Sequence, residues 1–349
     1  MFFLSISLVL ASSLIFTLCI EKLSERYNFL DKPNDRSSHS SPTPTLGGLA
    51  IVISFILYLL VDFLIFIPNF NDNSILSSDP NIFFLFLLVV PISVIGLIDD
   101  IGKVKILIRL IIQFIVATAV VYYFQILGNY VDVHMSSQES ILIFLISIIL
   151  MVWLMNLYNF MDGTDGYAAS ECVFVTLGAA LILFLNNTDP SLYSIILALS
   201  AATLGFLLRN LPSKAKIFMG DTGSVSIGFL LGFFIIWTAS ESLISIYTWL
   251  ILLSIFISDS SYTLFVRIVT KKNISVPHTS HAFQKLAYKR KTHTVPLKLM
   301  LITNFLWVLP MAILSNILLD YNVIITLLTY MPIIFYMLYI GAGLEEDYK

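Results

Sequence analysis

The sequence predicts an all-α polytopic membrane protein that forms a single transmembrane domain over residues 1–349. Hydrophobic residues make up 58% of the chain and charged residues only 12%, whereas charged residues are about a quarter of an ordinary soluble domain. The longest polar stretches, 21–46 and 270–296, each hold fewer than thirty residues. Because a soluble domain needs more chain than that to bury a core, none is expected between the apolar runs.

Eleven apolar runs are long enough to cross a bilayer, since a helical crossing takes about twenty mainly apolar residues. The first run has no Lys or Arg before it, which favours a membrane helix over a cleaved signal sequence. The NNTDP turn at 186–190 separates the sixth run from the seventh. The predicted spans are 2–20, 47–67, 81–98, 106–126, 141–158, 167–186, 191–208, 223–239, 242–269, 297–318 and 322–342.

The cations lie on one side of this predicted topology. All 19 Lys and Arg residues fall in or beside the segments that follow the odd-numbered spans, and the opposite segments hold acids such as Asp72, Asp132 and Glu139. Loops that stay in the cytoplasm collect Lys and Arg. We therefore expect the N-terminus outside and the C-terminus in the cytoplasm.

Five polar stretches follow odd-numbered spans, so the same topology places all of them on the cytoplasmic face. We expect them to converge on one site where the apolar helix ends meet water. The stretches are DKPNDRSSHSSPTPTLGG (31–48), GLIDDIGKVK (96–105), NLYNFMDGTDG (156–166), KAKIFMGDTGS (214–224) and VPHTSHAFQKLAYKR (276–290). The cytoplasmic loops that hold them are about 21–46, 99–105, 159–166, 209–222 and 270–296.

Asp99 and Asp100 are neighbouring carboxylates at a predicted helix end. A solvated helix stop is the simplest explanation of such a pair. Two like unit charges 4 Å apart repel by about 4 kcal/mol at an effective dielectric of 20. Near an apolar boundary this repulsion favours a bound metal ion or a shared proton.

Asp162, Asp165, Asp221 and Asn159 add further oxygen donors on the same face. Donor sets of oxygen alone suit Mg²⁺ or Mn²⁺, and Mg²⁺ commonly takes one or two carboxylates and completes its shell with phosphate and water. The residue types therefore predict a site for a hard divalent cation.

Glycines stand beside these acids at Gly163, Gly166, Gly220 and Gly223. A missing side chain lets backbone N–H groups approach a phosphate, and a turn that needs positive φ is the alternative explanation. The FMGDTGS stretch also opens the eighth span. We expect its N–H groups and helix dipole to face an anion.

His278 and His281 are three residues apart, which places both on one face if the segment is helical. Zinc binding is disfavoured because HTSH lacks a third soft ligand. Contacts to a phosphate or a base fit better, with Lys285, Lys289 and Arg290 adding positive potential. A basic amphipathic helix on the membrane surface is the alternative, and for His39 a loop role is equally compatible.

Acids for a metal, glycines for phosphate approach and nearby cations suit a reaction between a lipid phosphate and a soluble phosphate compound. An ion-coupled transporter is the main competing class, because intramembrane acids often mark transport pathways. A transporter should carry ionisable residues near mid-bilayer, whereas here Asp259 is the main exception to their placement at cytoplasmic ends. A scaffold without chemistry leaves the carboxylate clusters unexplained.

The motif set resembles the polyprenyl-phosphate N-acetylhexosamine-1-phosphate transferases, the glycosyltransferase family 4 superfamily. That superfamily includes the enzymes that initiate O-antigen and teichoic-acid linkage synthesis and the peptidoglycan translocase that makes the first lipid intermediate. The resemblance implies Mg²⁺-dependent transfer of a sugar 1-phosphate from a UDP-N-acetylhexosamine to undecaprenyl phosphate, which releases UMP. The matching stretches are DKPNDRSSHSSPTPTLGGLAI, GLIDDIGK, NLYNFMDGTDGYAA, IFMGDTGSVSIGF and PHTSHAFQKL.

The resemblance also implies roles for individual residues. The implied catalytic residues are Asp99, Asp100 and Asp162, with Asp99 and Asp100 handling the lipid phosphate. The implied metal ligands are Asp221 and Asn159. The implied substrate-binding residues are Asp165 and Gly220 in the nucleotide pocket, Phe218 against the uracil, His278 and His281 at the diphosphate or sugar, and Arg109 at the lipid phosphate.

The histidine stretch PHTSHAFQ lacks the longer HxHH form and resembles the O-antigen branch more closely. We therefore expect an initiating enzyme of a cell-surface glycan such as O-antigen in a bacterial inner membrane, with the phospho-N-acetylmuramoyl-pentapeptide transferase as the alternative. The expected partners are the UDP-sugar, undecaprenyl phosphate and the lipid bilayer, with no nucleic acid. A homodimer is left open.

Overall fold

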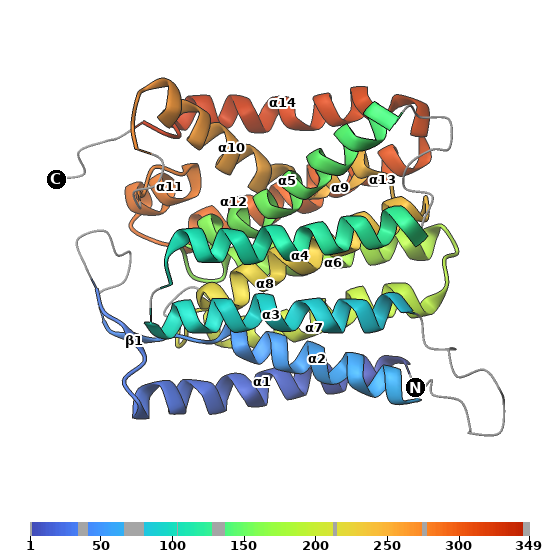
Figure 1. Cartoon of the computed structure of the whole chain (residues 1–349). Coiled ribbons are helices and arrows are strands. Elements are labelled where there is room, and N and C mark those ends of the chain that lie inside the picture. The colour runs from blue at the N-terminus through green and yellow to red at the C-terminus, as the bar shows by residue number, and fades with distance from the viewer. Residues whose placement is uncertain are drawn as a thin grey trace.

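Long helices lie side by side across the molecule in the computed structural model, from α1 at the bottom to α14 at the top (Figure 1). The structure describes residues 2–33, 41–65, 80–102, 104–127, 137–211, 215–273 and 278–344. The α-helices there are α1 (Phe2–Arg26), α2 (Gly48–Ile65), α3 (Pro80–Gly102), α4 (Ile106–Leu127), α5 (Ser137–Met161), α6 (Tyr167–Leu185), α7 (Pro190–Asn210), α8 (Gly220–Ser240), α9 (Ile246–Leu252), α10 (Ser254–Val269), α11 (Ala282–Arg290), α12 (Thr294–Thr303), α13 (Leu309–Ile317) and α14 (Asn322–Ile340).

The multi-pass membrane fold is confirmed. In the described part of the chain, nine helices are long and apolar enough to cross a membrane, and the bent pair α9–α10 raises the number to ten. The predicted span 47–67 corresponds to α2, whose apolar stretch Gly48–Asp62 is shorter than the others.

The ninth predicted span, 242–269, is divided in two. Helices α9 and α10 meet at an angle of 78° around Leu253, and neither Gly nor Pro stands at the break. The buried Trp249 holds α9 in place because its indole N–H donates to the Thr238 hydroxyl of α8 at 2.8 Å. Beyond the bend, α10 packs against α14 and α5.

The tenth predicted span contains a π-helix, η1 (Asn304–Val308), between α12 and α13. Asn304 lies inside the bundle and its amide donates to the Glu171 carboxylate of α6 at 2.5 Å. Both side chains are fully buried. Asn304, at the start of the wider π-helical turn, thus joins the α12–α13 segment to α6 through a polar contact inside the membrane region.

A short antiparallel pair of strands, β1 (Leu30–Asp31) and β2 (Thr43–Pro44), departs from the all-α prediction. The pairing continues beyond β2, because the Phe218 N–H donates to the Pro44 carbonyl at 2.8 Å and the Phe218 carbonyl accepts from the Gly47 N–H at 2.9 Å. The segment before α2 is therefore fixed to the segment before α8.

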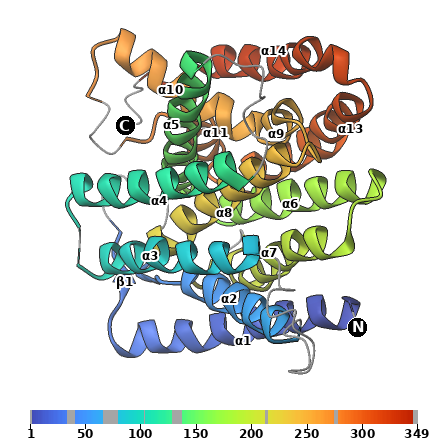
Figure 2. The same ribbon diagram turned by 45° about the vertical axis from the view of Figure 1, so that its right-hand side comes forward.

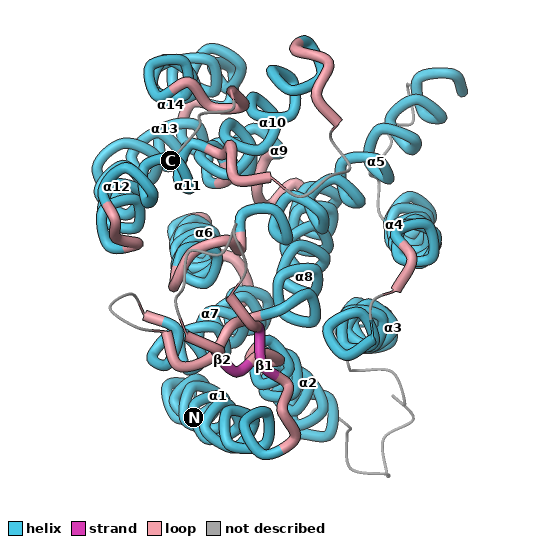
Figure 3. Tube along the Cα trace, turned by 90° about the vertical axis from the view of Figure 1, so that its left-hand side faces the viewer, coloured by secondary structure: helices cyan, strands magenta, loops and turns pink. Residues whose placement is uncertain are grey.

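Helix α8 lies at the centre of the bundle, packed against α3, α5 and α2 (Figures 2 and 3). Glycines permit the close crossings at its first turns. A Cβ on Gly48 would lie 2.2 Å from the Gly223 Cα, and a Cβ on Gly96 would lie 2.8 Å from the Thr222 Cα. Small residues of this kind let helix backbones approach closely in membranes.

We expect Gly223→Ala to lower the melting temperature of the protein. The new Cβ would lie 2.6 Å from the Gly48 Cα, where backbone atoms would have to move, and overpacking of this kind costs about 1–3 kcal/mol. Gly232→Ala on the same helix is the control, because its Cβ would meet only side-chain atoms, those of the flexible Met151 at 3.1 Å and of Leu154 at 3.8 Å. Equal melting temperatures for the two variants would contradict the crossing argument.

Candidate active site

Four helices bring charged and polar side chains together at one end of the bundle, the end that faces the viewer in Figure 3. Asp99 ends α3, Arg109 is in the first turn of α4, Asn159 is in the last turn of α5, and Asp221 begins α8. Residues that are far apart in the sequence thus meet in one small region.

The Arg109 guanidinium lies between two carboxylates. Its Nη1 is 2.6 Å from Asp221 Oδ2, and the same nitrogen donates to Asp99 Oδ2. The other oxygen of Asp221 accepts from the Asn159 amide at 2.7 Å, and the other oxygen of Asp99 accepts from the Val104 N–H at 2.5 Å. One cationic nitrogen therefore balances two acids from different helices.

Asp100 turns toward the start of α8. Its carboxylate accepts from the Asp221 N–H at 2.7 Å, the Thr222 N–H at 2.9 Å and the Thr222 hydroxyl at 2.6 Å. Gly220 makes room for this contact at a φ of 73°, because a Cβ there would lie 2.7 Å from Asp100 Oδ1. The expectation that an external anion faces these N–H groups needs correction, since a carboxylate of the chain itself caps the helix.

Asp162 follows α5 and is half-buried. Burial raises the pKa of its carboxyl well above the usual range, and the negative charges of Asp221, Asp100 and Asp165 raise it further. The Asp162 carboxyl therefore resists ionisation when no added cation is present.

We expect Asp162→Asn, measured in EDTA, to melt at a higher temperature than the wild type at pH 7. A raised pKa means that the folded protein holds a proton that the unfolded chain releases above about pH 4, so wild-type stability falls as the pH rises from there toward the folded-state pKa. The asparagine has no proton to lose, and thermal unfolding at several pH values should show a flatter profile.

Asp189→Asn is the control of opposite sign for this measurement. The Ser191 N–H and hydroxyl hold the pKa of the exposed Asp189 carboxyl below its usual value, so its stabilising effect is present at neutral pH and is lost on acidification. This variant should melt slightly lower at pH 7. A pH profile for Asp162→Asn that matches the wild type would contradict the assignment.

Asp165 joins three segments. Its Oδ2 accepts from the Ala215 N–H at 3.3 Å, and its Oδ1 lies 3.2 Å from His293 Nδ1. Next to it, the Gly166 N–H donates to Asn210, the last residue of α7, at 2.8 Å. The acid-rich turn 162–166 is thereby attached to the ends of α7 and α12 and to the segment before α8.

Sequence reasoning missed His293, which directly precedes α12. A signal was available, because His293 is a third histidine in the polar stretch 270–296 and stands at a helix start. Asn210 was also missed, and no signal in the sequence marked it.

The two predicted histidines precede α11 and are not on a helix, so the condition under which their spacing would place them on one helical face is not met. Their rings nevertheless stack, with centroids 5.1 Å apart. His281 is 2% exposed and its Nδ1 lies 3.3 Å from Asp259 Oδ1, while His278 Nδ1 lies 3.0 Å from the Ser280 hydroxyl. His281 thus faces the protein interior.

Asp259, the exception among the predicted intramembrane acids, caps α11. Its carboxylate accepts from the Ala282 N–H at 2.9 Å and the Phe283 N–H at 3.1 Å. Lys285 is buried and donates to the Gly341 carbonyl at 2.7 Å, at the end of α14. It therefore caps another helix, which corrects the expectation that it adds positive potential to a substrate site.

The acid-rich turn contacts α11 at Gly163. A Cβ on Gly163 would lie 2.7 Å from Gln284 Nε2, so a larger residue there would have to move the Gln284 side chain of α11. Gly166 adopts a φ of 72°, which supports the alternative of a turn residue at that position. Phe218 is half-buried beside Gly47. His39 and Lys103 lie outside the described residues.

A hard divalent cation fits the donor chemistry of this region. Asp99 and Asp221 direct oxygens at one cationic position, held here by Arg109, and Mg²⁺ commonly takes one or two carboxylates and leaves its other positions to phosphate and water. Within the described ranges, no group of three or more His, Cys, Asp or Glu side chains is placed to hold a metal. The described residues would therefore supply only one or two carboxylate ligands to such an ion, from Asp99 and Asp221.

Comparisons with known proteins agree with the resemblance. Residues 82–239 match the family model for Glycosyl transferase family 4. The chain is 26% identical over 335 residues to a probable undecaprenyl-phosphate N-acetylglucosaminyl 1-phosphate transferase of Bacillus subtilis, covering 93% of this chain and 88% of that protein.

Two further relatives give the same range of similarity. The chain is 31% identical over 282 residues to a phospho-N-acetylmuramoyl-pentapeptide-transferase of Prochlorococcus marinus subsp. pastoris, covering 74% of this chain and 73% of that protein. It is 28% identical over 305 residues to an undecaprenyl-phosphate alpha-N-acetylglucosaminyl 1-phosphate transferase of Thermotoga maritima, covering 84% and 86%.

Proposed function

Because the chain belongs to glycosyl transferase family 4, we propose that it transfers N-acetylhexosamine 1-phosphate from a UDP-sugar to undecaprenyl phosphate. The meeting of Asp99, Arg109, Asn159 and Asp221 at one end of the bundle carries the proposal. A site built from carboxylates and one guanidinium at helix ends suits phosphates that arrive from a membrane lipid and from water.

The proposed topology has eleven spans, with the N-terminus outside and this site on the cytoplasmic face of a bacterial inner membrane. The placement of all 19 Lys and Arg residues in or beside the segments after odd-numbered spans supports it. A cytoplasmic site gives access to nucleotide sugars, while the carrier lipid keeps its chain in the bilayer.

The proposed reaction is an in-line phosphoryl transfer. An oxygen of undecaprenyl phosphate attacks the β-phosphorus of the UDP-sugar, and the bond from that phosphorus to the oxygen shared with the α-phosphate breaks, which releases UMP. The attacking oxygen is already largely ionised at neutral pH. Catalysis therefore depends mainly on positioning and on neutralising charge.

Arg109 and Asp99 are proposed to position the lipid phosphate, with Arg109 leaving its carboxylate partners to pair with that phosphate. Asp221 and Asn159 are proposed to hold Mg²⁺, which when bound supplies positive charge to the diphosphate. Asp162 is proposed to act beside them, and Asp100 to act by holding the first turn of α8 in place.

The remaining contacts are proposed on the nucleotide side. Phe218 is proposed to stack on the uracil, and Gly220 and Asp165 to shape the nucleotide pocket. His278 is proposed to reach the sugar or diphosphate, with His281 positioned behind it against Asp259.

N-acetylglucosamine is the sugar that the names of two relatives favour. A phospho-N-acetylmuramoyl-pentapeptide transferase is the second candidate, favoured by the 31% identity to the Prochlorococcus protein. We further propose that the product starts a cell-surface glycan such as O-antigen.

The test is UMP release by the purified protein with undecaprenyl phosphate, Mg²⁺ and a panel of UDP-N-acetylglucosamine, UDP-N-acetylgalactosamine, their 6-deoxy analogues and UDP-N-acetylmuramoyl-pentapeptide. At least one sugar nucleotide should give UMP together with a lipid-diphosphate sugar. If monodisperse, folded protein releases no UMP with any sugar nucleotide of the panel, the proposal is overturned.

A further inference from the structure

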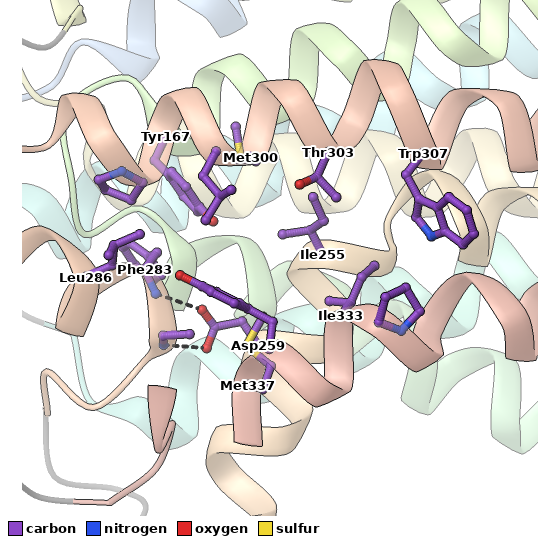
Figure 4. Close-up of a pocket in the computed structure, with 15 residues that line it drawn as sticks. Tyr167, Ile255, Asp259, Phe283, Leu286, Met300, Thr303, Trp307, Ile333 and Met337 are labelled. Atoms are coloured by element: carbon purple, nitrogen blue, oxygen red, sulfur yellow. Dashed lines mark hydrogen bonds between the residues drawn. The ribbon is translucent and has the colours of Figure 1, made fainter. Parts of the chain in front are cut away.

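A cavity of about 310 Å³ lies between α6, α10, α11, α12 and α14 (Figure 4). This volume is at the lower end of the range for ligand-binding pockets, roughly 300–1,000 Å³. Tyr167, Phe283 and Asp259 gather at one end of the view and Trp307 lies at the other. None of the roles proposed above uses this space.

The lining of the cavity is apolar. Ile255, Leu286, Met300, Ile333 and Met337 supply much of the wall. Within the described part of the chain, Asp259 is the single ionisable acid or base other than tyrosine in the lining. Its two oxygens already accept from the first N–H groups of α11. A cavity with this lining does not attract water and binds hydrocarbon.

The cavity opens toward the lipid side of the bundle. On its α12 and η1 side, Leu299 and Trp307 are 39% and 38% exposed, and Pro332 of α14 is also exposed. Both helical segments are candidate membrane spans at the edge of the bundle. Met300 and Met337, at 2% and 3% exposed, lie inside, so a hydrocarbon chain would enter sideways past Leu299 and Trp307.

Two stacked aromatic rings, Tyr167 and Phe283, form part of the cavity wall. The Phe283 ring stacks on the Tyr167 ring with centroids 4.6 Å apart, and Tyr167 stacks in turn on Phe256. Among the described residues that line the cavity there is no Lys or Arg, so a phosphate group placed there would lack a counter-charge from them and would lie near Asp259. The cavity is therefore suited to a chain and not to a head group.

We propose that this cavity binds one acyl chain of a bilayer phospholipid, which enters between α12 and α14 and supports α11 from the membrane side. The bound chain would press on Phe283 and so stabilise α11, whose Gln284 contacts the turn that carries Asp162 and Asp165. Bilayer phospholipid is the occupant because the exposed side of the cavity, at Leu299 and Trp307, lies on candidate membrane spans, and because the described lining holds no cation for a phosphate head group. This proposal does not depend on the proposed reaction.

The test uses the full chain in vesicles of phosphatidylethanolamine and phosphatidylglycerol that contain a phospholipid with a diazirine on its acyl chain. After illumination, mass spectrometry of peptides should find adducts on Met300 and Met337, which lipid on the outer surface cannot reach, as well as on exposed residues such as Ile302 and Phe335. Adducts confined to exposed residues would overturn the proposal.

Thr303→Phe should fill the cavity, because the Thr303 side chain lines it (Figure 4). This variant should lose the adducts on Met300 and Met337 and keep those on exposed residues. Ile302→Phe is the matched control, since Ile302 is 56% exposed on the same helix, and its labelling should equal that of the wild type. If Thr303→Phe elutes from size-exclusion chromatography as the wild type does and both methionines are still labelled, the proposal is contradicted.

A second experiment identifies which lipid supplies the hydrocarbon chain in the cavity. Undecaprenyl phosphate with a diazirine in its tail should not compete for Met300 and Met337 when phospholipid is in excess. Preferential labelling of these residues by the prenyl probe would reject bilayer phospholipid and assign the cavity to the carrier.

Discussion

Asp221→Asn should reduce UMP release by about three orders of magnitude, the size of effect seen when one electrostatic contact to a developing charge is removed from an active site. Asp221 accepts from Asn159 and pairs with Arg109, so it is the carboxylate on which residues of α4, α5 and α8 converge. Its asparagine analogue keeps the shape but removes the charge that would attract a divalent cation.

The measurement is UMP release at saturating Mg²⁺, together with Mn²⁺ binding followed by electron paramagnetic resonance. Asp221→Asn should lose Mn²⁺ binding as well as turnover. Asp189→Asn is the control and should keep both, because Asp189 is an exposed cap of α7. Near-normal turnover in Asp221→Asn would remove this residue from the proposed metal site.

Arg109→Gln should change turnover and metal binding in opposite directions. Turnover should fall by about two to three orders of magnitude, since a charged contact to the reacting phosphate would be lost. Binding of Mn²⁺ without substrate should become tighter, because the Arg109 nitrogen lies between Asp99 and Asp221 where the metal would be attracted. Removing one positive charge there leaves Asp99 and Asp221 without their cationic partner.

Lys298→Gln is the control for Arg109→Gln, because it removes the same charge from an exposed position on α12. It should leave turnover and Mn²⁺ affinity unchanged. Weaker Mn²⁺ binding in Arg109→Gln would mean that the guanidinium supports the metal site and does not compete for it.

The helices and the meeting of polar residues at one end of the bundle could be predicted from the sequence because both follow from solvent preference. Apolar runs must cross a bilayer as helices, and polar stretches at their ends cannot lie in hydrocarbon. Asp99, Asn159 and Asp221 therefore had to lie near helix ends on a shared side. Their meeting at Arg109 confirms the spatial expectation for these residues.

The partners of individual side chains could not be predicted, because residue type does not specify direction. Asp99 and Asp100 are neighbours, yet one faces Arg109 and the other caps α8. Asp259 and Lys285 have the same appearance in sequence as functional charges, and both satisfy helix ends. The bend at Leu253 also had no local signal, since packing between helices determines it.

The cap that Asp100 places on α8 limits what that helix can offer a substrate. Its second and third N–H groups, those of Asp221 and Thr222, are already satisfied by the chain's own acid, so an incoming diphosphate gains little from the positive end of the dipole. Under the proposed reaction, the missing attraction must come from an exchangeable ion. Withdrawal of that ion by a chelator would then stop turnover while the bundle stays assembled, and restoring it would restart the protein without refolding.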